Sequence, residues 1–290
     1  MRGAYVLGAV DALFSHYGLK QVDVVTGTSG SVGTLAYYAA GQFYPGYYIW
    51  TEEIPRADFL SFLNPLRGKP VMDIDYLIDE SFKKKIPITV SNLKSSKTKL
   101  VASVVSRKTG TVNYIDAHTC PHDLFEVLRA TMAAPIVYNK TVRLGSDDYF
   151  DSFFSDPIPL DNPFVQDTRK IIILSKPLEF SPNVRGHKLA FMFKPFLTEV
   201  AYAAMLKRDQ VRQVRVEECK RLAAQGDIVI APATMPTQTL DNRRASIERL
   251  IAQGYRDAVA HPQLQKLTQE LRQSSQKDFL FPEPAAAVPL

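Results

Sequence analysis

The chain has 290 residues, of which 46% are hydrophobic and 22% are charged, a composition typical of a globular protein with a sizeable core. Its two cysteines, Cys120 and Cys219, are too few and too far apart for a disulfide framework. The net charge of +5 favours contact with an anionic membrane surface but is too small to indicate nucleic-acid binding. No run approaches the roughly 18 apolar residues of a membrane span.

The N-terminus and the overall organisation give further expectations. Residues 1–5 lack an apolar stretch leading to a cleavage site, so we expect no signal peptide and a cytoplasmic protein, peripheral to the membrane at most. No repeat or clear linker interrupts the chain. We therefore predict one domain over residues 1–280, followed by a loose, proline-containing tail at 281–290.

The first forty residues alternate between helical and strand patterns. Apolar spacing predicts a helix over 3–17, a strand over 22–26, a tight turn, and a helix that ends at Ala40 before Gly41. This alternation is typical of an α/β fold, with a parallel sheet covered by helices on both faces.

Residues 42–70 are rich in aromatic residues and proline, which predicts short helices and loops. We expect their rings to pack in the core rather than to face lipid, although an active-site loop facing lipid is the alternative. The three lysines at 83–85 are interpreted as a solvated helix face, with membrane contact as the alternative.

The rest of the chain continues the same alternation. The pattern predicts a hairpin of 98–106 and 111–115 around Gly110, a helix at 122–132, a strand at 171–174, a long helix at 197–224, a strand at 227–231 and a helix at 241–259.

Residues 27–31 read G-T-S-G-S between the first predicted strand and the following helix. A strand, a tight turn of small residues and a helix N-terminus meeting at Ser29 would expose its hydroxyl as a nucleophile for acyl chemistry. The motif is imperfect, because G-x-S-x-G requires glycine at Ser31.

A second informative stretch lies at residues 150–160, F-D-S-F-F-S-D-P-I-P-L. Asp151 stands at the end of a short apolar segment, and residues 156–159 form a stiff, extended turn. Taken alone, Asp151 is a loop carboxylate with a capping or turn-forming role.

The two stretches together are informative. G-T-S-G-S followed far downstream by D-S and then D-P-I-P resembles the patatin-like phospholipases, whose usual pairing is G-x-S-x-G with D-G-G/A. Three further stretches fit the resemblance: M-R-G-A-Y at 1–5, A-T-M-A-A-P at 130–135, and D-I-V-I-A-P at 227–232 with the later Gly254 and Tyr255.

The resemblance implies a three-layer α/β/α patatin-like fold with a mostly parallel central sheet. It also implies a lipid acyl hydrolase that uses a Ser–Asp dyad and no catalytic histidine. Ser29 would attack the ester carbonyl of a lipid or phospholipid, and Asp151 would take its proton and later activate water against the acyl-enzyme. Partial burial would raise the basicity of Asp151. No metal or organic cofactor is implied.

The sequence departs from the family pattern in three places. In the family, a Gly-Gly-Gly loop supplies the oxyanion donors, and its position would fall before Met1. Arg2 and Gly3 therefore only border the position of that loop. The strand that precedes the loop in the family is missing as well. The Gly30 N–H is then a remaining oxyanion donor. We expect that a start codon assigned too late explains this departure better than a genuinely short protein.

The other two departures are Ser31 and Ser152, each in place of a glycine of the family pattern. If position 152 needs a positive φ, serine there costs about 1 kcal/mol.

Four alternatives remain open. The first is a catalytically impaired patatin-like protein that binds lipid or acyl groups without turnover. The second is nucleotide binding by residues 27–33, which lack both G-x-G-x-x-G and a P-loop lysine. The third is a metal site at residues 118–122, H-T-C-P-H, where no fourth ligand is evident. The fourth is acyl transfer to another acceptor, which generally needs a histidine base. The acyl chain, the head group and the oligomeric state stay open.

Overall fold

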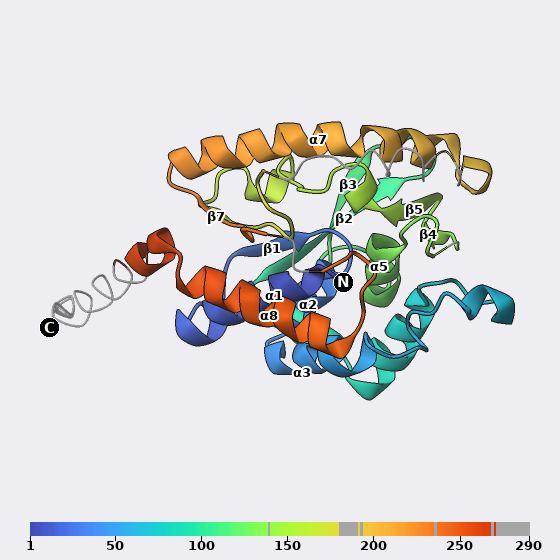
Figure 1. The fold of residues 1–290 in the computed structure, drawn as a ribbon, viewed down its shortest axis with the longest axis horizontal. Coiled ribbons are helices and arrows are strands. Elements are labelled where there is room, and N and C mark those ends of the chain that lie inside the picture. Colours follow the sequence, from blue (N-terminus) through green and yellow to red (C-terminus); the bar gives the residue numbers. More distant parts are fainter. Residues whose placement is uncertain (139, 180–190, 192–193, 235–236, 268–269, 271–290) are drawn as a thin grey trace, which may run out of the picture.

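The computed structural model describes residues 1–138, 140–179, 191, 194–234, 237–267 and 270 (Figure 1). The predicted loose tail at 281–290 lies outside these residues.

The main sheet is built around one long central strand. Its strands are β1 (Val24–Gly27), β2 (Lys99–Ser106), β3 (Val112–Asp116), β4 (Val142–Leu144) and β5 (Asp147–Asp151). They run in the order β1-β2-β5-β4, and β3 also pairs with β2. The pair β1–β2 is parallel, whereas β2–β3, β2–β5 and β4–β5 are antiparallel.

A second sheet pairs β6 (Ile171–Ile173) with β7 (Ile228–Ile230) in parallel. The α/β class predicted from the sequence is confirmed, and the sheets together are mixed, because hairpins supply the antiparallel pairs. Figure 1 shows α7 (Glu199–Ala224) along one side of the strands, with α1 (Gly3–Asp11), α2 (Ser31–Ala39) and α8 (Arg244–Val259) on the other side. The strands therefore form the middle of three layers.

Shorter helical segments complete the fold. They are α3 (Phe43–Tyr48), α4 (Val90–Ser95), α5 (Leu124–Met132), π-helical stretches at Ala12–His16, Ile49–Glu53 and Tyr76–Lys85, and 3-10 turns at Asn64–Arg67, Ser152–Phe154, Pro163–Val165 and Lys194–Phe196.

Helices α1 and α8 pack against each other unusually closely. A Cβ atom on Gly8 would lie 1.9 Å from the Ile251 carbonyl oxygen, and one on Gly254 would lie 2.0 Å from the Tyr5 carbonyl oxygen. Each helix thus presents a glycine to the backbone of the other. This contact buries α1, which starts beside the candidate site, in the centre of the molecule.

Most predicted elements occur close to their expected positions. The predicted hairpin forms, with Gly110 at a φ of +75°, and Gly41 follows α2 at a φ of +69°. The sequence did not predict the hairpin of β4 and β5. That hairpin contains four aspartate and arginine residues in ten positions, β4 is only three residues long, and β5 (D-D-Y-F-D) lacks an apolar alternation.

The aromatic region at 42–70 divides into two groups. Phe43, Trp50 and Phe59 are buried, as expected from core packing, whereas Tyr44 and Phe62 are largely exposed. The lysines at 83–85 lie on a helix face as predicted, and each forms an ion pair with a carboxylate, to Asp79, Glu80 and Glu53.

Two observations bear on the surface. Over the described residues, every helix is either too short or too polar to cross a bilayer.

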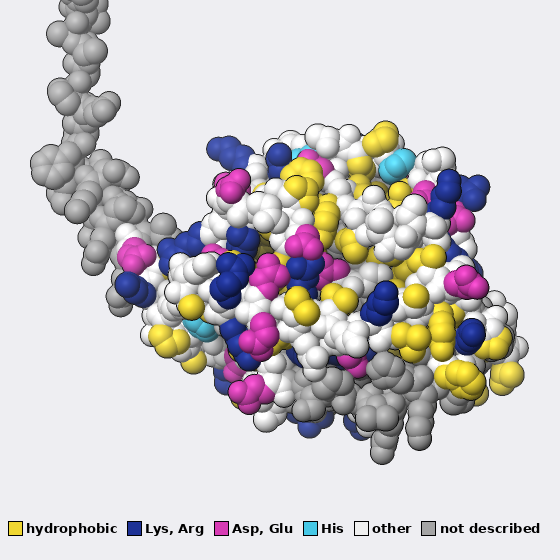
Figure 2. All heavy atoms as spheres, turned by 90° about the horizontal axis from the view of Figure 1, so that it is seen from above, with side chains coloured by type: hydrophobic (Ala, Val, Ile, Leu, Met, Phe, Trp, Pro, Cys, Tyr) yellow, Lys and Arg dark blue, Asp and Glu magenta, His cyan; other side chains and the backbone are white. Residues whose placement is uncertain are grey.

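Figure 2, which views the molecule from the α7 side, shows basic and acidic side chains interspersed on that face.

Candidate active site

The site forms where two strands end on the same edge of β2. Strand β3 pairs with β2 along Val101–Val105, so β1 and β5 must both lie on the opposite edge. There β1 ends with Gly27 opposite Ala102, and antiparallel β5 ends with Asp151 opposite Val104. The two strands approach each other end to end, which brings residues from distant parts of the sequence to one place.

The Ser29 turn has the backbone geometry of a nucleophile elbow. Ser29 has a φ of +56°, in the left-handed region that non-glycine residues rarely adopt. Gly30 is the N-cap of α2, and the Val32 N–H donates to the Ser29 carbonyl at 3.1 Å. A strained conformation at a single serine between strand and helix indicates a functional turn.

Ser31, which replaces the glycine of the motif, is accommodated in this turn. Its hydroxyl donates to the Thr28 carbonyl at 2.6 Å. A Cβ on Gly27 would lie 2.8 Å from the Ser31 oxygen, so the glycine makes room for that hydroxyl. The substitution therefore adds a hydrogen bond across the turn instead of obstructing it.

Asp151 is almost fully buried, with 1% of its surface exposed. Burial raises the pKa of its carboxyl to about 7, and the nearby Ser29 hydroxyl and the Phe153 N–H, which donates to Oδ1 at 2.9 Å, pull that pKa down. The Ser29 and Asp151 side chains thus interact electrostatically, although they do not form a hydrogen bond of standard geometry. Catalytic hydrogen bonds often have this looser form before substrate binds.

A buried chain of hydroxyl groups connects the two strand ends. Ser103, between Ala102 and Val104 on β2, donates to the Gly27 carbonyl at 2.7 Å. Its oxygen also lies 2.8 Å from the Ser152 oxygen. A serine hydroxyl has a single proton, and Ser103 uses it in the hydrogen bond to the Gly27 carbonyl. Ser152 is therefore the donor in this second bond. Ser103 is a site residue that sequence reasoning missed, although a serine inside an apolar strand was a usable signal.

Ser152 does not show the backbone strain considered for it. Within the described residues, the non-glycine residues with positive φ are Ser29 and Ile136. Ser152 instead begins a 3-10 turn capped by Asp151. The site therefore does not require the left-handed conformation that favours glycine.

The three other predicted site residues, Arg2, Gly3 and Gly30, lie at adjacent helix N-termini. A Cβ on Gly3 would lie 2.7 Å from Cη2 of Trp50 and 3.6 Å from the Ser31 nitrogen, and one on Gly30 would lie 3.6 Å from the same Trp50 atom. The Trp50 indole thus covers both glycines. Its Nε1 donates to the Thr34 hydroxyl on α2 at 2.9 Å, which fixes the ring over the start of both helices.

The histidine and cysteine side chains of the alternative metal site contact backbone carbonyls. At residues 118–122, His118 Nε2 lies 3.3 Å from the Ser96 carbonyl, and the Cys120 thiol contacts the His122 carbonyl at 3.6 Å. Across the described residues, no three His, Cys, Asp or Glu side chains converge as metal ligands.

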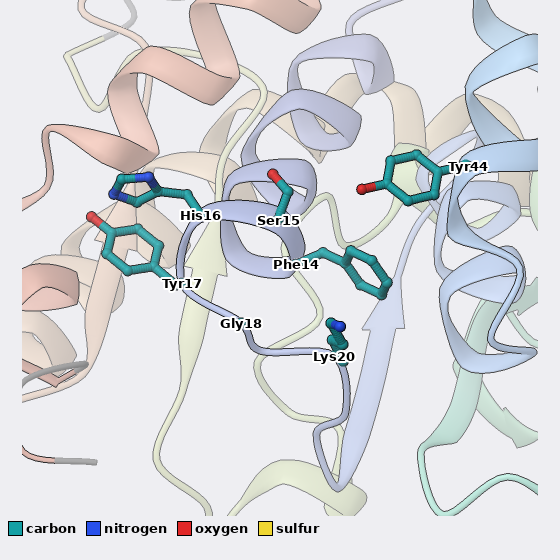
Figure 3. Close-up of a pocket in the computed structure, with 7 residues that line it drawn as sticks. All are labelled: Phe14, Ser15, His16, Tyr17, Gly18, Lys20 and Tyr44. Atoms are coloured by element: carbon teal, nitrogen blue, oxygen red, sulfur yellow. The ribbon is translucent and has the colours of Figure 1, made fainter. Parts of the chain in front are cut away.

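A surface pocket lies elsewhere in the molecule. Figure 3 shows its lining residues, which are Phe14, Ser15, His16, Tyr17, Gly18, Lys20 and Tyr44. All of them except Tyr44 come just before β1 in the sequence and lead into its first residue, whereas Ser29 comes just after its last residue. The pocket is therefore at the opposite end of that strand from the candidate nucleophile.

Comparison with known proteins identifies the family of the chain. Over 178 residues the chain is 24% identical to the uncharacterized protein YjjU of Escherichia coli (strain K12), an alignment that covers 60% of this chain and 48% of YjjU. The chain thus spans about half the length of that relative. Residues 1–164, which include Ser29, Asp151 and the hydroxyl chain between them, match the model of the patatin-like phospholipases. The chain belongs to the patatin-like phospholipase family.

Proposed function

We propose that this protein is a lipid acyl hydrolase of the phospholipase A or esterase type, with Ser29 as nucleophile and Asp151 as general base. The observation that carries the proposal is the placement of the left-handed Ser29 turn beside a buried carboxyl whose pKa is about 7. A base with a pKa near the working pH is well matched to removing a hydroxyl proton.

The reaction proceeds in two halves. Ser29 Oγ attacks the ester carbonyl carbon while Asp151 takes the hydroxyl proton. The tetrahedral intermediate then collapses, and Asp151 returns the proton to the departing alcohol. Water attacks the acyl-enzyme with Asp151 again as base, the carboxylic acid leaves, and Ser29 regains its proton.

The oxyanion of each intermediate needs hydrogen-bond donors. We assign the Gly30 N–H to this role, because Gly30 directly follows Ser29 and caps the N-terminus of α2, where the helix dipole favours negative charge. Gly3 and Arg2 lie beside it at the start of α1 and border the same space.

A lipid substrate requires access to a membrane or micelle surface. Phe62, Leu63 and Leu66 are 69%, 59% and 85% exposed, and the basic residues Arg67 and Lys69 follow them directly. Exposed apolar side chains beside cations suit peripheral contact with an anionic bilayer. Flotation with phosphatidylcholine vesicles containing phosphatidylglycerol tests this contact, and Leu66→Ser should weaken it.

The decisive experiment combines turnover with active-site labelling. Wild-type protein should hydrolyse short p-nitrophenyl esters and react covalently with a fluorophosphonate probe. Ser29→Ala should abolish both signals, and Asp151→Asn should reduce both by at least a hundredfold while leaving the fold intact by circular dichroism. Ser95→Ala and Asp58→Asn, which alter exposed groups of the same chemistry, serve as matched controls.

Two outcomes would contradict the assignment. Ester hydrolysis that survives Ser29→Ala would place the nucleophile elsewhere. A folded protein that binds lipid yet neither hydrolyses esters nor labels at Ser29 would instead indicate the catalytically impaired, lipid-binding form.

A further inference from the structure

The single tryptophan of the chain lies against the Ser29 turn. Trp50 belongs to the stretch Ile49–Glu53 and is 6% exposed, so the protein encloses its ring. The outer edge of the ring faces two glycines, Gly3 at the start of α1 and Gly30 at the start of α2. An added Cβ would lie 2.7 Å from Trp50 Cη2 at Gly3 and 3.6 Å from it at Gly30. The ring therefore fills the space between the first residues of these two neighbouring helices (Figure 1).

The opposite end of the indole is hydrogen-bonded to α2. Trp50 Nε1 donates to the Thr34 hydroxyl at 2.9 Å, in a contact buried from solvent. Thr34 comes four residues after Gly30, so the two residues lie on one face of the helix, about one turn apart. The indole thus spans the first turn of α2, with a hydrogen bond at one end and close packing against backbone at the other.

The segment that carries the ring is held from a second side. Arg244, at the start of α8, forms an ion pair of 2.7 Å with Glu52. The Asn242 side chain donates to the Ile54 carbonyl at 3.1 Å. Because Trp50 is attached both to α2 and to the region around the start of α8, a shift of the ring would break contacts with two elements.

Gly30 is the residue whose position this packing controls. Its N–H, the proposed oxyanion donor, belongs to the peptide unit between Ser29 and Gly30. One hydrogen bond holds this unit, from the Val32 N–H to the Ser29 carbonyl at 3.1 Å. Glycine has the widest backbone freedom of any residue, and Gly30 follows a serine in a strained conformation. Packing of Gly30 against Trp50 is the second constraint on the direction of this N–H.

We infer that Trp50 is a positioning residue for the proposed reaction, because its indole holds the Gly30 N–H where the oxyanion develops. The inference rests on the proposed function and adds a residue that acts through Gly30. An oxyanion donor stabilises the intermediate only within hydrogen-bond reach of the developing charge. A misplacement of about 1 Å can cost about a hundredfold in rate, so a rigid ring behind the donor has a direct kinetic consequence.

Another buried ring of the same region provides a matched control. Phe43 is 2% exposed and packs against the rings of Phe14, Tyr38 and Tyr47. Tyr38 lies near the end of α2, whereas the Ser29 turn precedes its start, so these contacts are about 12 Å along the helix from the turn. Loss of the Phe43 ring therefore affects the core without acting on Gly30.

Substitution of the ring tests its role. Trp50→Phe removes Nε1 and the outer ring atoms that reach the two glycines. For p-nitrophenyl butyrate, kcat should fall about ten- to a hundredfold while KM changes by less than about twofold. Thr34→Val, which removes only the acceptor of the indole N–H, should lower kcat by a smaller factor. Phe43→Leu should lower the thermal unfolding temperature and leave kcat unchanged. Wild-type kcat in Trp50→Phe, or an equal fall of kcat in Phe43→Leu, would overturn the inference.

The pH profile separates a displaced donor from a general opening of the site. The midpoint of kcat/KM against pH should be the same in Trp50→Phe as in the wild type, because burial keeps the pKa of Asp151 at about 7 in both. A site opened to solvent would shift the midpoint to lower pH. That shift would show a merely structural role of Trp50 and overturn the inference.

Fluorescence provides a test in the wild-type protein, which stays readable even where Trp50→Phe fails to fold. Because Trp50 is the single tryptophan, all tryptophan emission comes from this site. Attachment of a fluorophosphonate to Ser29 should change the emission at the rate at which activity is lost, and Ser29→Ala should show no change. Constant emission through complete labelling would overturn the role of the ring at the oxyanion site. Protein that neither hydrolyses esters nor labels at Ser29 would instead refute the proposed function itself.

Discussion

Ser103 and Ser152 share a buried hydrogen bond of 2.8 Å, and the Ser103 hydroxyl donates a hydrogen bond to the carbonyl of Gly27 at 2.7 Å. Gly27 comes two residues before Ser29, and Ser152 directly follows Asp151. One hydroxyl on β2 therefore links the backbone carbonyl that precedes the Ser29 turn to the side chain that follows Asp151. We expect the spacing between the candidate nucleophile and the candidate base to depend on this link.

Ser103→Ala should destabilise the protein and slow its reaction. The change leaves the Gly27 carbonyl and the Ser152 hydroxyl buried without their partner, which costs about 1–3 kcal/mol. We expect a corresponding decrease in the urea midpoint, and a fall in kcat with little change in KM. Ser95→Ala, at an exposed hydroxyl, should shift stability by less than about 0.5 kcal/mol. A Ser103→Ala variant with full kcat would show that the hydroxyl chain does not position the dyad.

Activity should follow the ionisation of Asp151. Because burial raises the pKa of this carboxyl to about 7, the base form accumulates only as the pH passes through neutrality. The value of kcat/KM should rise with pH and level off above about 7. Histidines titrate in the same range. The temperature dependence separates them, because a carboxyl ionises with little enthalpy and imidazole with much. A strongly temperature-dependent midpoint would argue against Asp151 as the base.

The same ionisation makes stability depend on pH. In the unfolded chain the Asp151 carboxyl has a pKa of about 3.9, so between about pH 4 and 7 the folded state binds the proton more tightly. Stability should therefore fall as pH rises through this window. Asp151→Asn removes this dependence and should be more stable than wild type at pH 8, by up to about 4 kcal/mol for a shift of roughly 3 units. Parallel urea titrations of both proteins at pH 4.5 and 8 measure the difference.

The sequence points to the candidate dyad but not to the strand arrangement that brings its two residues together. Ser29 and Asp151 were identifiable because a strand–turn–helix pattern and an apolar segment ending in a carboxylate are local features. The means by which they meet is not local. It requires β1 and β5 to end on the same edge of β2, and β5 forms from a charged hairpin with no alternating pattern.

The different environments of the arginines on α7 were hidden from the sequence for a related reason. Arg208 and Arg212 belong to a helix with many charged residues, where a solvated face is the usual interpretation. Only the fold shows that they turn toward Lys176 and Arg2, while Arg215 on the same helix turns toward three carboxylates. Charge counting along the chain cannot separate these two environments.

Arg215 should be essential for stability. It holds Asp156, which is 4% exposed, through hydrogen bonds of 3.1 and 2.9 Å, and so fixes the turn after Asp151 against α7. Arg215→Gln leaves the Asp156 carboxyl buried without its cation, a change that costs about 3–5 kcal/mol. Thermal unfolding measures this loss. Arg221→Gln on the same helix is the matched control, and an equal Tm change in both variants would refute the role of Arg215 as a clamp.

Gly254 should tolerate no larger residue. A Cβ there would lie 2.0 Å from the Tyr5 carbonyl oxygen and 3.0 Å from the Ala9 nitrogen, which are backbone atoms that cannot move aside without displacing α1. Helix propensity alone would make Gly254→Ala stabilising by about 1 kcal/mol, but overpacking opposes it with about 1–3 kcal/mol or more. We expect net destabilisation, and because α1 begins at Gly3 beside Ser31, we also expect weaker fluorophosphonate labelling of Ser29. Arg256→Ala, on the exposed side of α8, should leave both properties unchanged. If Gly254→Ala proved more stable than wild type, helices α1 and α8 could not be in backbone contact.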